Sequence, residues 1–438
     1  MKIMKHFFVV ICLITFITNC RFFQSQPYQN TKIAFQYHNP TQKDIEFLSH
    51  FDIVVTGKFW DSKMVKFLRS KKVKLFYYEW LPAIYYCSRH NNWEEMIYQN
   101  RLRWTLDPGD SDPDPLGDQY GCLDLFYDMA DEELLEARVD HIAHLIQLNN
   151  YDGVFFDWGG GWNELKERSY AFLMDEFLKR HPGIQYNDKT NEFLRKIKQK
   201  GILIMVNGGF RSDRSQLDQY ADFDVVESMF TTTECIDTHE IYIAEEGIRK
   251  VCDTRFNTVQ NSLDLAVSLP RKAAATNNKI QFFFLDYAFP YYRDTDSKIR
   301  SADKEYRIFG KTTDRQAVFY ALACSYMGDA SGFVAGPKVS LDSVIDDIYF
   351  YPVGKAVSNL EKINDDVYIR YFSNGIVILS DRDATVEVAL PAGKDKVFDL
   401  YEKRYNEISN NRMMVNLASQ IYPSGAKHPI GRIYQYEH

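Results

Sequence analysis

The sequence predicts an α/β fold, a (β/α)8 TIM barrel followed by a small C-terminal antiparallel β domain. Eight short apolar segments alternate with helical segments over about 300 residues, as a barrel of this type requires. Several of these segments end in a polar side chain, and near residue 354 the pattern changes to short strands joined by turn signals. Continuous apolar runs are typical of parallel strands, because both faces of such strands are covered.

The central segment of the predicted barrel is Tyr151-Asp-Gly-Val-Phe-Phe-Asp-Trp-Gly-Gly-Gly-Trp-Asn-Glu164. It contains a short buried strand that ends at Asp157 and continues into a glycine-rich turn. Catalytic side chains of (β/α)8 barrels lie at the C-terminal ends of the strands, which is the position of Asp157. Burying a carboxylate is costly unless it is paired. The alternative is that Asp157 caps the next helix or pairs with an arginine.

The other strands are expected where short apolar runs are bounded by turn signals. They are 31–37, 51–56, 74–80, 201–209, 223–228, 279–287 and 331–335. Helices are expected where apolar residues recur at helical spacing. They are 41–49, 61–68, 128–150, 165–178, 190–200, 263–275 and 314–327. Two long segments, 81–127 and 231–260, are expected to be irregular loops, and long loops in a compact domain are usually functional or mobile.

The barrel is predicted to occupy residues 31–350, and residues 355–438 are predicted to form a β-sandwich-like module. An Asn374-Gly375 turn signal joins two strands between residues 367 and 380, which is typical of a hairpin. Period-two alternation continues at 385–390. Neither a Gly-x-Gly-x-x-Gly fingerprint nor a P-loop occurs in the chain, which disfavours nucleotide-binding folds.

Residues 1–19 have the pattern of a signal peptide, with two lysines before an apolar run at 7–18 that is too short to span a bilayer. The run ends at Ile17-Thr18-Asn19-Cys20, which resembles a bacterial lipobox. We therefore expect Cys20 to be the lipidated first residue of the mature chain, followed by a tether over 20–30. The chain would then be exported and anchored to a membrane of the bacterial cell envelope or surface. Ordinary cleavage nearby, giving a periplasmic or secreted protein, is the alternative.

The composition excludes some partners and favours others. The net charge of −8 argues against nucleic-acid binding, which needs a basic surface. Aromatic residues make up 15% of the chain, and their flat faces are surfaces on which sugar rings pack. The seven cysteines show no zinc-site spacing, and neither a metal nor an organic cofactor is predicted. A disulfide between Cys235 and Cys252 remains open.

Polar residues at the ends of several strands are expected to gather at one rim of the barrel. Like charges held together repel, so stability alone does not explain such a cluster. Glycoside cleavage needs one carboxylic acid to protonate the leaving oxygen and a second carboxylate to attack the anomeric carbon or to activate water. The predicted substrate-binding residues, at strand ends and in nearby aromatic positions, are Tyr37, Glu79, Trp80, Trp158, Trp162, Asn207, Asp286 and Tyr287. Asn207 has either this role or a structural one.

The segment that ends at Asp157, followed downstream by Asp224-Val-Val-Glu227-Ser228, resembles the TIM-barrel enzymes of glycoside hydrolase family 114, a group that includes endo-α-1,4-polygalactosaminidases. The resemblance covers roughly residues 31–336 and implies that Asp157 and Glu227 are the paired catalytic carboxylates. We assign Asp157 as nucleophile or general base and Glu227 as general acid. A structural ion pair is the alternative for Glu227. The C-terminal module and the two long segments depart from a minimal barrel of this family.

The predicted function is that of an exported glycoside hydrolase that cleaves a polysaccharide. The alternative is a non-catalytic surface lipoprotein that keeps the barrel and binds a glycan. The distance between the two carboxylates separates these hypotheses. Glycosidases hold them about 5–5.5 Å apart for retention of configuration, or about 6.5–9.5 Å apart for inversion.

Overall fold

The computed structural model describes residues 31–37, 39–87, 89–107, 122–167, 170–208, 220–243, 247–275, 280–288, 291–294, 306–308, 314–328, 330–335, 353–420 and 427–437. The predicted signal peptide, the tether and Cys20 lie outside these residues. Among the described helices, none combines the length and the apolar character needed to cross a membrane.

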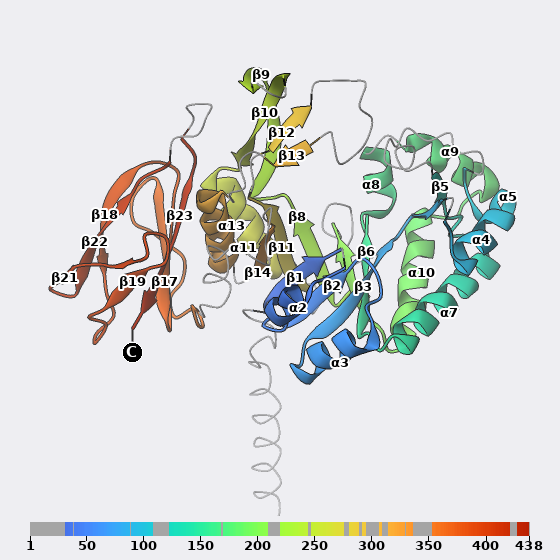
Figure 1. Ribbon diagram of the computed structural model, residues 1–438, viewed down its shortest axis with the longest axis horizontal. Helices are drawn as coiled ribbons and strands as arrows, with labels where there is room; N and C mark the ends of the chain where they lie inside the picture. The colour runs from blue at the N-terminus through green and yellow to red at the C-terminus, as the bar shows by residue number, and fades with distance from the viewer. Residues whose placement is uncertain are drawn as a thin grey trace, which may run out of the picture.

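The core of the molecule is an eight-stranded sheet in which every neighbouring pair of strands is parallel (Figure 1). In spatial order the strands are β1 (Ile33–Gln36), β2 (Ile53–Thr56), β3 (Lys74–Trp80), β6 (Gly153–Asp157), β7 (Leu203–Asn207), β8 (Phe223–Glu227), β11 (Gln281–Tyr287) and β14 (Ser331–Ala335). The spatial order is also the chain order, and Cα atoms of β1 and β14 come within 8 Å of each other. The sheet thus curls into the predicted (β/α)8 barrel.

Helices connect most successive strands and cover the outside of the barrel. They are α2 (Gln42–Leu48), α3 (Ser62–Ser70), α7 (Glu132–Leu148), α8 (Gly161–Glu167), α9 (Ala171–Arg180), α10 (Tyr186–Gln199), α11 (Val259–Ala275) and α13 (Arg315–Met327). Side chains cap several of them: Asp61, Asp131 and Asp314 accept hydrogen bonds from backbone N–H groups in the first turns of α3, α7 and α13. Such caps satisfy N–H groups that have no partner within the helix, and they fix where each helix begins.

Aromatic rings from different strands fill the barrel interior. Phe223 of β8 contacts both Phe76 of β3 and Phe283 of β11, with ring centroids 5.7 and 5.4 Å apart. Phe155 of β6 contacts Phe35 of β1 at 5.5 Å. These residues fix which positions of each strand face inward, because side chains alternate between the two faces of a strand.

The segment 81–127 was expected to be irregular, and the structure corrects that expectation. It contains the antiparallel pair β4 (Ala83–Tyr86) and β5 (Leu123–Phe126), and the helices α4 (Asn92–Gln99) and α5 (Arg101–Trp104). Asn91 and Glu94 form a capping box at the start of α4. A disulfide between Cys87 and Cys122 joins the two ends of the insertion, a cross-link that the sequence analysis did not predict.

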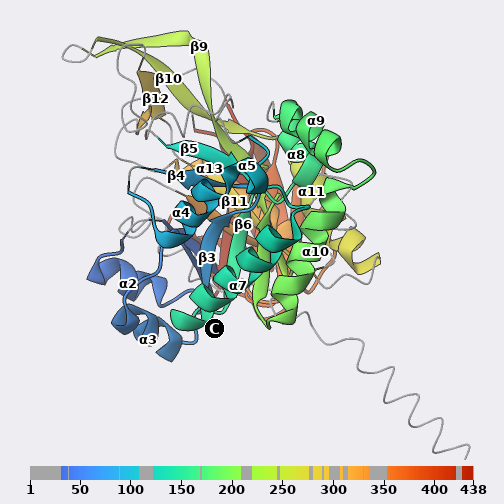
Figure 2. The same cartoon turned by 90° about the vertical axis from the view of Figure 1, so that its right-hand side faces the viewer.

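The segment 231–260 is likewise not a loop. It forms a long hairpin of β9 (Thr231–Ile243) and β10 (Gly247–Phe256), which is extended by β12 (Tyr291–Asp294) and β13 (Tyr306–Ile308) into a four-stranded sheet. The hairpin follows β8 directly and projects away from the barrel (Figure 2). Cys235 and Cys252 lie opposite each other in its register, and a disulfide between them stays a prediction.

The C-terminal module is antiparallel, as predicted. One sheet contains, in spatial order, β15 (Glu361–Lys362), β16 (Val367–Phe372), β17 (Gly375–Ser380), β23 (Ile430–Tyr436), β19 (Val397–Asp399) and β20 (Arg404–Tyr405). The other contains β18 (Ala384–Ala389), β22 (Arg412–Leu417) and β21 (Ile408–Ser409). Apolar side chains of both sheets form a common core.

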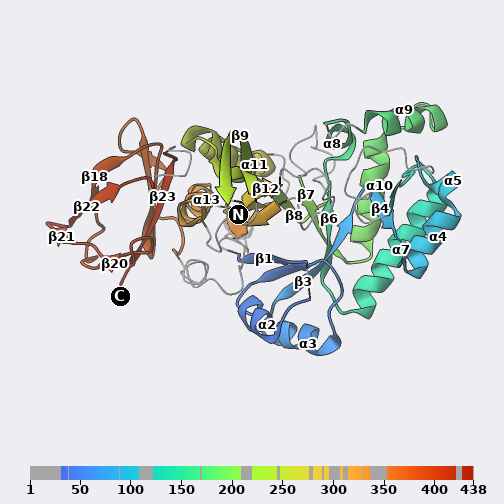
Figure 3. The same cartoon turned by 45° about the horizontal axis from the view of Figure 1, so that its top comes forward.

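Helix α13 lies between the barrel and the module (Figure 3). Almost all of its side chains are buried, because it packs against barrel strands on one side and against β23 and β17 on the other. A Cβ atom at Gly431 of β23 would lie 2.5 Å from the Phe319 carbonyl oxygen, so the strand reaches the helix backbone only as glycine. The buried Gln316 amide also donates to the carbonyl oxygens of His428 and Pro429.

Candidate active site

Three polar residues end three adjacent barrel strands. Asp157, Asn207 and Glu227 are the last residues of β6, β7 and β8. Because these strands are parallel and neighbours in the sheet, their C-terminal ends meet at the same rim. All three side chains point into the barrel, where Asn207 contacts both acids.

The Asn207 side chain connects the two carboxylates. Its Nδ2 donates to Oδ1 of Asp157 at 2.8 Å and to Oε2 of Glu227 at 2.7 Å. These two acceptor oxygens therefore lie no farther apart than the sum of the two distances, about 5.5 Å. This upper limit is compatible with the range of retaining glycosidases and is below that of inverting ones. The amide satisfies both carboxylates at once, so they can share a small space despite their like charge.

A tyrosine hydroxyl holds each carboxylate from its other side. Tyr78 of β3 donates to Oδ2 of Asp157 at 2.9 Å, and Tyr287 of β11 donates to Oε1 of Glu227 at 2.5 Å. Burial, followed by the charge of the carboxylate that each contacts, raises the pKa of both phenols far above the ordinary value. Both tyrosines therefore remain protonated donors. The backbone N–H of Trp158 adds a third donor to Asp157, at 2.9 Å.

The chain turns sharply after each of the three strands. Trp158, Gly208 and Ser228 follow the polar residues directly and have φ values of 54°, 77° and 57°, all in the left-handed region. Glycine adopts this conformation freely, but for tryptophan and serine it costs on the order of 1–3 kcal/mol. A Cβ atom at Gly159 would lie 2.9 Å from the Asn207 carbonyl oxygen, so the first turn also needs glycine for its close approach to β7. Strain is thus concentrated beside the carboxylates.

Tyr37 lies just past the end of β1 and keeps 43% of its surface exposed. Its ring contacts Tyr78 edge to face, with centroids 5.4 Å apart. Burial of its hydroxyl end, and then the charges of Asp157 and Glu227, raise its pKa well above the ordinary value. The partly exposed ring beside both carboxylates suits the predicted contact with a sugar.

The three predicted tryptophans have different surroundings. Trp80 is buried and stacks on Tyr85, with ring centroids 4.7 Å apart, while Trp158 meets it edge to face at 5.0 Å. Trp158 is half-buried and directly follows Asp157, to whose carboxylate its backbone N–H donates. Trp162, in the first turn of α8, packs toward Phe177 and Tyr186 on α9 and α10.

Glu79 is not brought into this cluster. It follows Tyr78 directly and therefore points to the opposite, outer face of β3. There its Oε1 lies 3.8 Å from Nη2 of Arg138 on α7. Burial raises the pKa of Glu79 to about 7; the charge of Arg138 opposes this shift, and that of Glu94 adds to it.

Asp286 also lies on the outer face. It precedes Tyr287, which faces inward, and its Oδ1 accepts hydrogen bonds from the backbone N–H groups of Phe230 and Thr231 at 2.8 and 3.0 Å. Burial raises its pKa to about 7, against the effect of the backbone donors. Asp286 thus anchors the start of the β9–β10 hairpin beside β11 and has no contact with Asp157.

Two important residues were missed in the sequence. The sequence does not single out Tyr78, because both faces of β3 carry apolar or aromatic residues and the inward direction cannot be read from them. Arg138 is fully buried, and its guanidinium donates to the carbonyl oxygens of Leu81 and Trp80 at the end of β3. It appeared only as one charged position in an amphipathic helix, and nothing in that pattern marks it as buried.

Comparison with known proteins finds no matching family model and no matching curated protein. Among solved structures, similar folds include the glycoside hydrolase domain of PelA from Pseudomonas aeruginosa, 16% identical, covering 70% of this chain and 96% of that one with a TM-score of 0.43. A maltogenic α-amylase from Thermotoga neapolitana is 9% identical, covering 94% and 99% with a TM-score of 0.48. A GH27 β-L-arabinopyranosidase from Geobacillus stearothermophilus is 10% identical, covering 94% and 98% with a TM-score of 0.48. At these identities and scores, the activities of those proteins are not transferred to this chain.

Proposed function

We propose that this protein is a glycoside hydrolase that cleaves a polysaccharide, with Asp157 and Glu227 as its catalytic pair. The observation that carries the proposal is the shared Asn207 amide, which holds one oxygen of each carboxylate within about 5.5 Å of the other. This separation favours cleavage with retention of configuration. It also argues against the alternative of a purely glycan-binding protein, since sugar binding alone does not require two carboxylates at this distance.

The proposed roles follow from the donors around each carboxylate. Asp157 accepts hydrogen bonds from Tyr78, Asn207 and the Trp158 backbone, and donors of this number stabilise an ionised oxygen. We therefore assign Asp157 as the nucleophile. Glu227, bonded to Asn207 and Tyr287, is assigned as the general acid and base.

The reaction would proceed in two displacements. In the first, an Asp157 carboxylate oxygen attacks the anomeric carbon while Glu227 gives its proton to the departing glycosidic oxygen, leaving a sugar ester on Asp157. In the second, Glu227 takes a proton from water, and the resulting hydroxide oxygen displaces Asp157 from the anomeric carbon. The product is a free sugar end with the original configuration, and both carboxyl groups return to their starting state.

The substrate class is a further part of the proposal. The resemblance to glycoside hydrolase family 114 favours a polymer that contains amino sugars. Tyr37 and Trp158, which lie beside the carboxylates with part of their surface exposed, would pack against sugar rings on either side of the bond to be cleaved.

The test is reducing-end release from a panel of bacterial and fungal exopolysaccharides, with wild type, Asp157→Asn and Glu227→Gln compared. We expect wild type to cleave at least one polymer and both near-isosteric variants to lose about 10²–10⁴-fold in rate while they keep the wild-type melting temperature. The anomeric configuration of the fresh product, read by NMR, should match that of the substrate. Unchanged cleavage in both variants would disprove the site assignment, and an inverted product would disprove the nucleophile role.

Export and anchoring form a separate proposal, because Cys20 lies outside the described residues. We propose that the chain is cleaved before Cys20 and lipidated there, as its lipobox-like segment suggests. Mass spectrometry of the mature N-terminal peptide tests this: a diacylglycerol adduct on Cys20 is expected, and an unmodified N-terminus beyond residue 20 would contradict it.

A further inference from the structure

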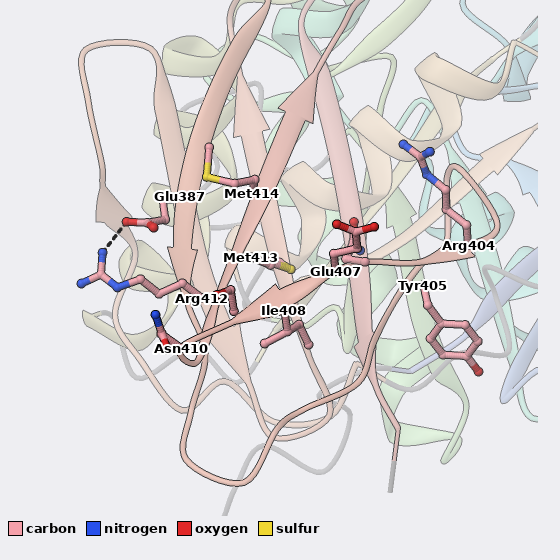
Figure 4. A pocket seen from close by; sticks show the side chains of 11 residues that line it. Glu387, Arg404, Tyr405, Glu407, Ile408, Asn410, Arg412, Met413 and Met414 are labelled. Atoms are coloured by element: carbon pink, nitrogen blue, oxygen red, sulfur yellow. Dashed lines mark hydrogen bonds and ion pairs between the residues drawn. The ribbon is translucent and has the colours of Figure 1, made fainter.

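Two cavities among the described residues are lined by neither Asp157 nor Glu227. One, of about 660 Å³, is on the C-terminal module and is lined by residues of β18, β20, β21 and β22 (Figure 4). Its Glu387 is already paired with Arg412. The other, of about 580 Å³, lies beside β3 and is lined by Glu79 and Tyr78 together with other residues of β3, β4, α4 and α7. The second contains Glu79, a half-buried acid that lies beyond hydrogen-bond distance of its ion-pair partner Arg138.

Few groups around the Glu79 carboxylate stabilise its negative charge. Its Oε1 is 3.8 Å from Arg138, beyond hydrogen-bond distance, and the side chain keeps only 16% of its surface exposed. The guanidinium is committed elsewhere: it donates to two backbone carbonyls and lies over the Tyr127 ring at 4.0 Å. A buried carboxylate with no close donor is costly, so a cationic ligand would gain from binding it.

Aromatic rings form the walls around this acid. Phe59 and Tyr77 stack with centroids 4.0 Å apart, and Trp93 stacks on His141 at 4.3 Å. Aromatic faces attract cations and also pack against a ring. The other titratable groups that line the cavity do not oppose a cation. Glu94 is acidic, and burial lowers the pKa of His141 to about 4, which leaves it neutral at pH 7.

We propose that this cavity, which we call the outer β3 pocket, binds a protonated primary amine carried on a ring of monosaccharide size. The Glu79 carboxylate would accept hydrogen bonds from the ammonium group, and Phe59, Tyr77 and Trp93 would pack against the ring. Its volume falls in the range of small-molecule sites. Tyr78 also lines the pocket, but Glu79 points to the face of β3 opposite to Asp157, and neither Asp157 nor Glu227 is part of the lining. It is therefore a second site that does not depend on the proposed function.

Calorimetric titration with cyclohexylamine and cyclohexanol tests the proposal, because the two probes share a six-membered ring and only the amine is charged between pH 6 and 8. We expect the amine to bind wild type at least tenfold more tightly than the alcohol at pH 8. Glu79→Gln should weaken binding of the amine at least tenfold, and Phe59→Leu should weaken binding of both probes. The matched control is Glu95→Gln. Glu95 lies on the same helix as Glu94 but accepts hydrogen bonds from Tyr86 and Gln99. This substitution should leave the affinity for both probes unchanged.

The pH dependence gives an independent readout. Because the pKa of Glu79 is about 7, the amine should bind about tenfold more weakly at pH 6 than at pH 8, and Glu79→Gln should abolish this difference. The same titrations in Asp157→Asn should match wild type. Equal binding of amine and alcohol, unchanged binding in Glu79→Gln, or loss of binding in Asp157→Asn would each overturn the proposal. Glucosamine then tests whether an amino sugar occupies the pocket.

Discussion

Asp157 and Asp286 both lie at the end of a buried parallel strand, yet they are on opposite faces of the barrel wall. Asp157 faces inward and contacts Asn207 and Tyr78. Asp286 faces outward, where backbone N–H groups of the β9–β10 hairpin occupy its Oδ1. Glu227 and Glu79 form a second pair with the same contrast. A shift of one residue along a strand therefore decides whether an acid can take part in chemistry or in structure.

The largest expected effect tests this contrast directly. Asp157→Asn should lower kcat about 10²–10⁴-fold, because it removes the proposed nucleophile. Asp286→Asn, the same chemical change one face away, should leave kcat within about twofold of wild type. Initial rates on the polymer that wild type cleaves decide the outcome. A similar loss in both variants would show that the inner and outer acids are not distinct.

Asn207→Ala should have the next largest effect. The amide donates to both carboxylates, and hydrogen bonds to charged groups are worth about 1.5–3 kcal/mol each. We expect kcat to fall about 10–10²-fold with a smaller change in KM, because the two like charges are no longer held together. The pH–rate profile should also move, which a purely structural role would not cause. An unchanged profile would contradict the bridging role.

Tyr287→Phe should have a smaller effect on catalysis, about a tenfold loss in kcat, since it removes one donor to Glu227 and leaves the ring in place. Tyr151→Phe is the matched control. Its hydroxyl accepts hydrogen bonds from Thr56 and from the Trp60 backbone, away from both carboxylates. That variant should lose stability in a thermal melt but keep kcat. The assignment fails if the two variants behave alike.

Asp286 should instead control how stability depends on pH. Its folded-state pKa, about 7, is above the ordinary value of 3.8, so the folded protein binds this proton more tightly than the unfolded chain. The stability it contributes is present below about pH 4 and is lost as pH rises to about 7. The free energy of unfolding of Asp286→Asn should therefore rise by about 4 kcal/mol relative to that of wild type between pH 4 and pH 8. Urea unfolding of both proteins at pH 4 and at pH 8 measures this change. If the difference in free energy of unfolding between variant and wild type were the same at both pH values, the raised pKa of Asp286 would be contradicted.

The sequence by itself determined much of the fold. Each of the eight barrel strands was predicted within a few residues of its observed position, because buried parallel strands are continuous apolar runs with turn signals at both ends. Asp157, Asn207 and Glu227 could be selected because each follows such a run. The long segments 81–127 and 231–260 were misjudged, since short strands and helices there lack strong periodicity and depend on a disulfide or on hairpin pairing.

Only the tertiary structure decided which strand-end side chains meet. In β3 and β11 both faces carry apolar or aromatic residues, so the sequence shows no strict alternation from which to read the inward face. Packing of Phe76 and Phe283 against Phe223 fixes that choice, and with it the inward direction of Tyr78 and Tyr287. Glu79 and Asp286 are then directed outward, because successive side chains of a strand point to opposite faces.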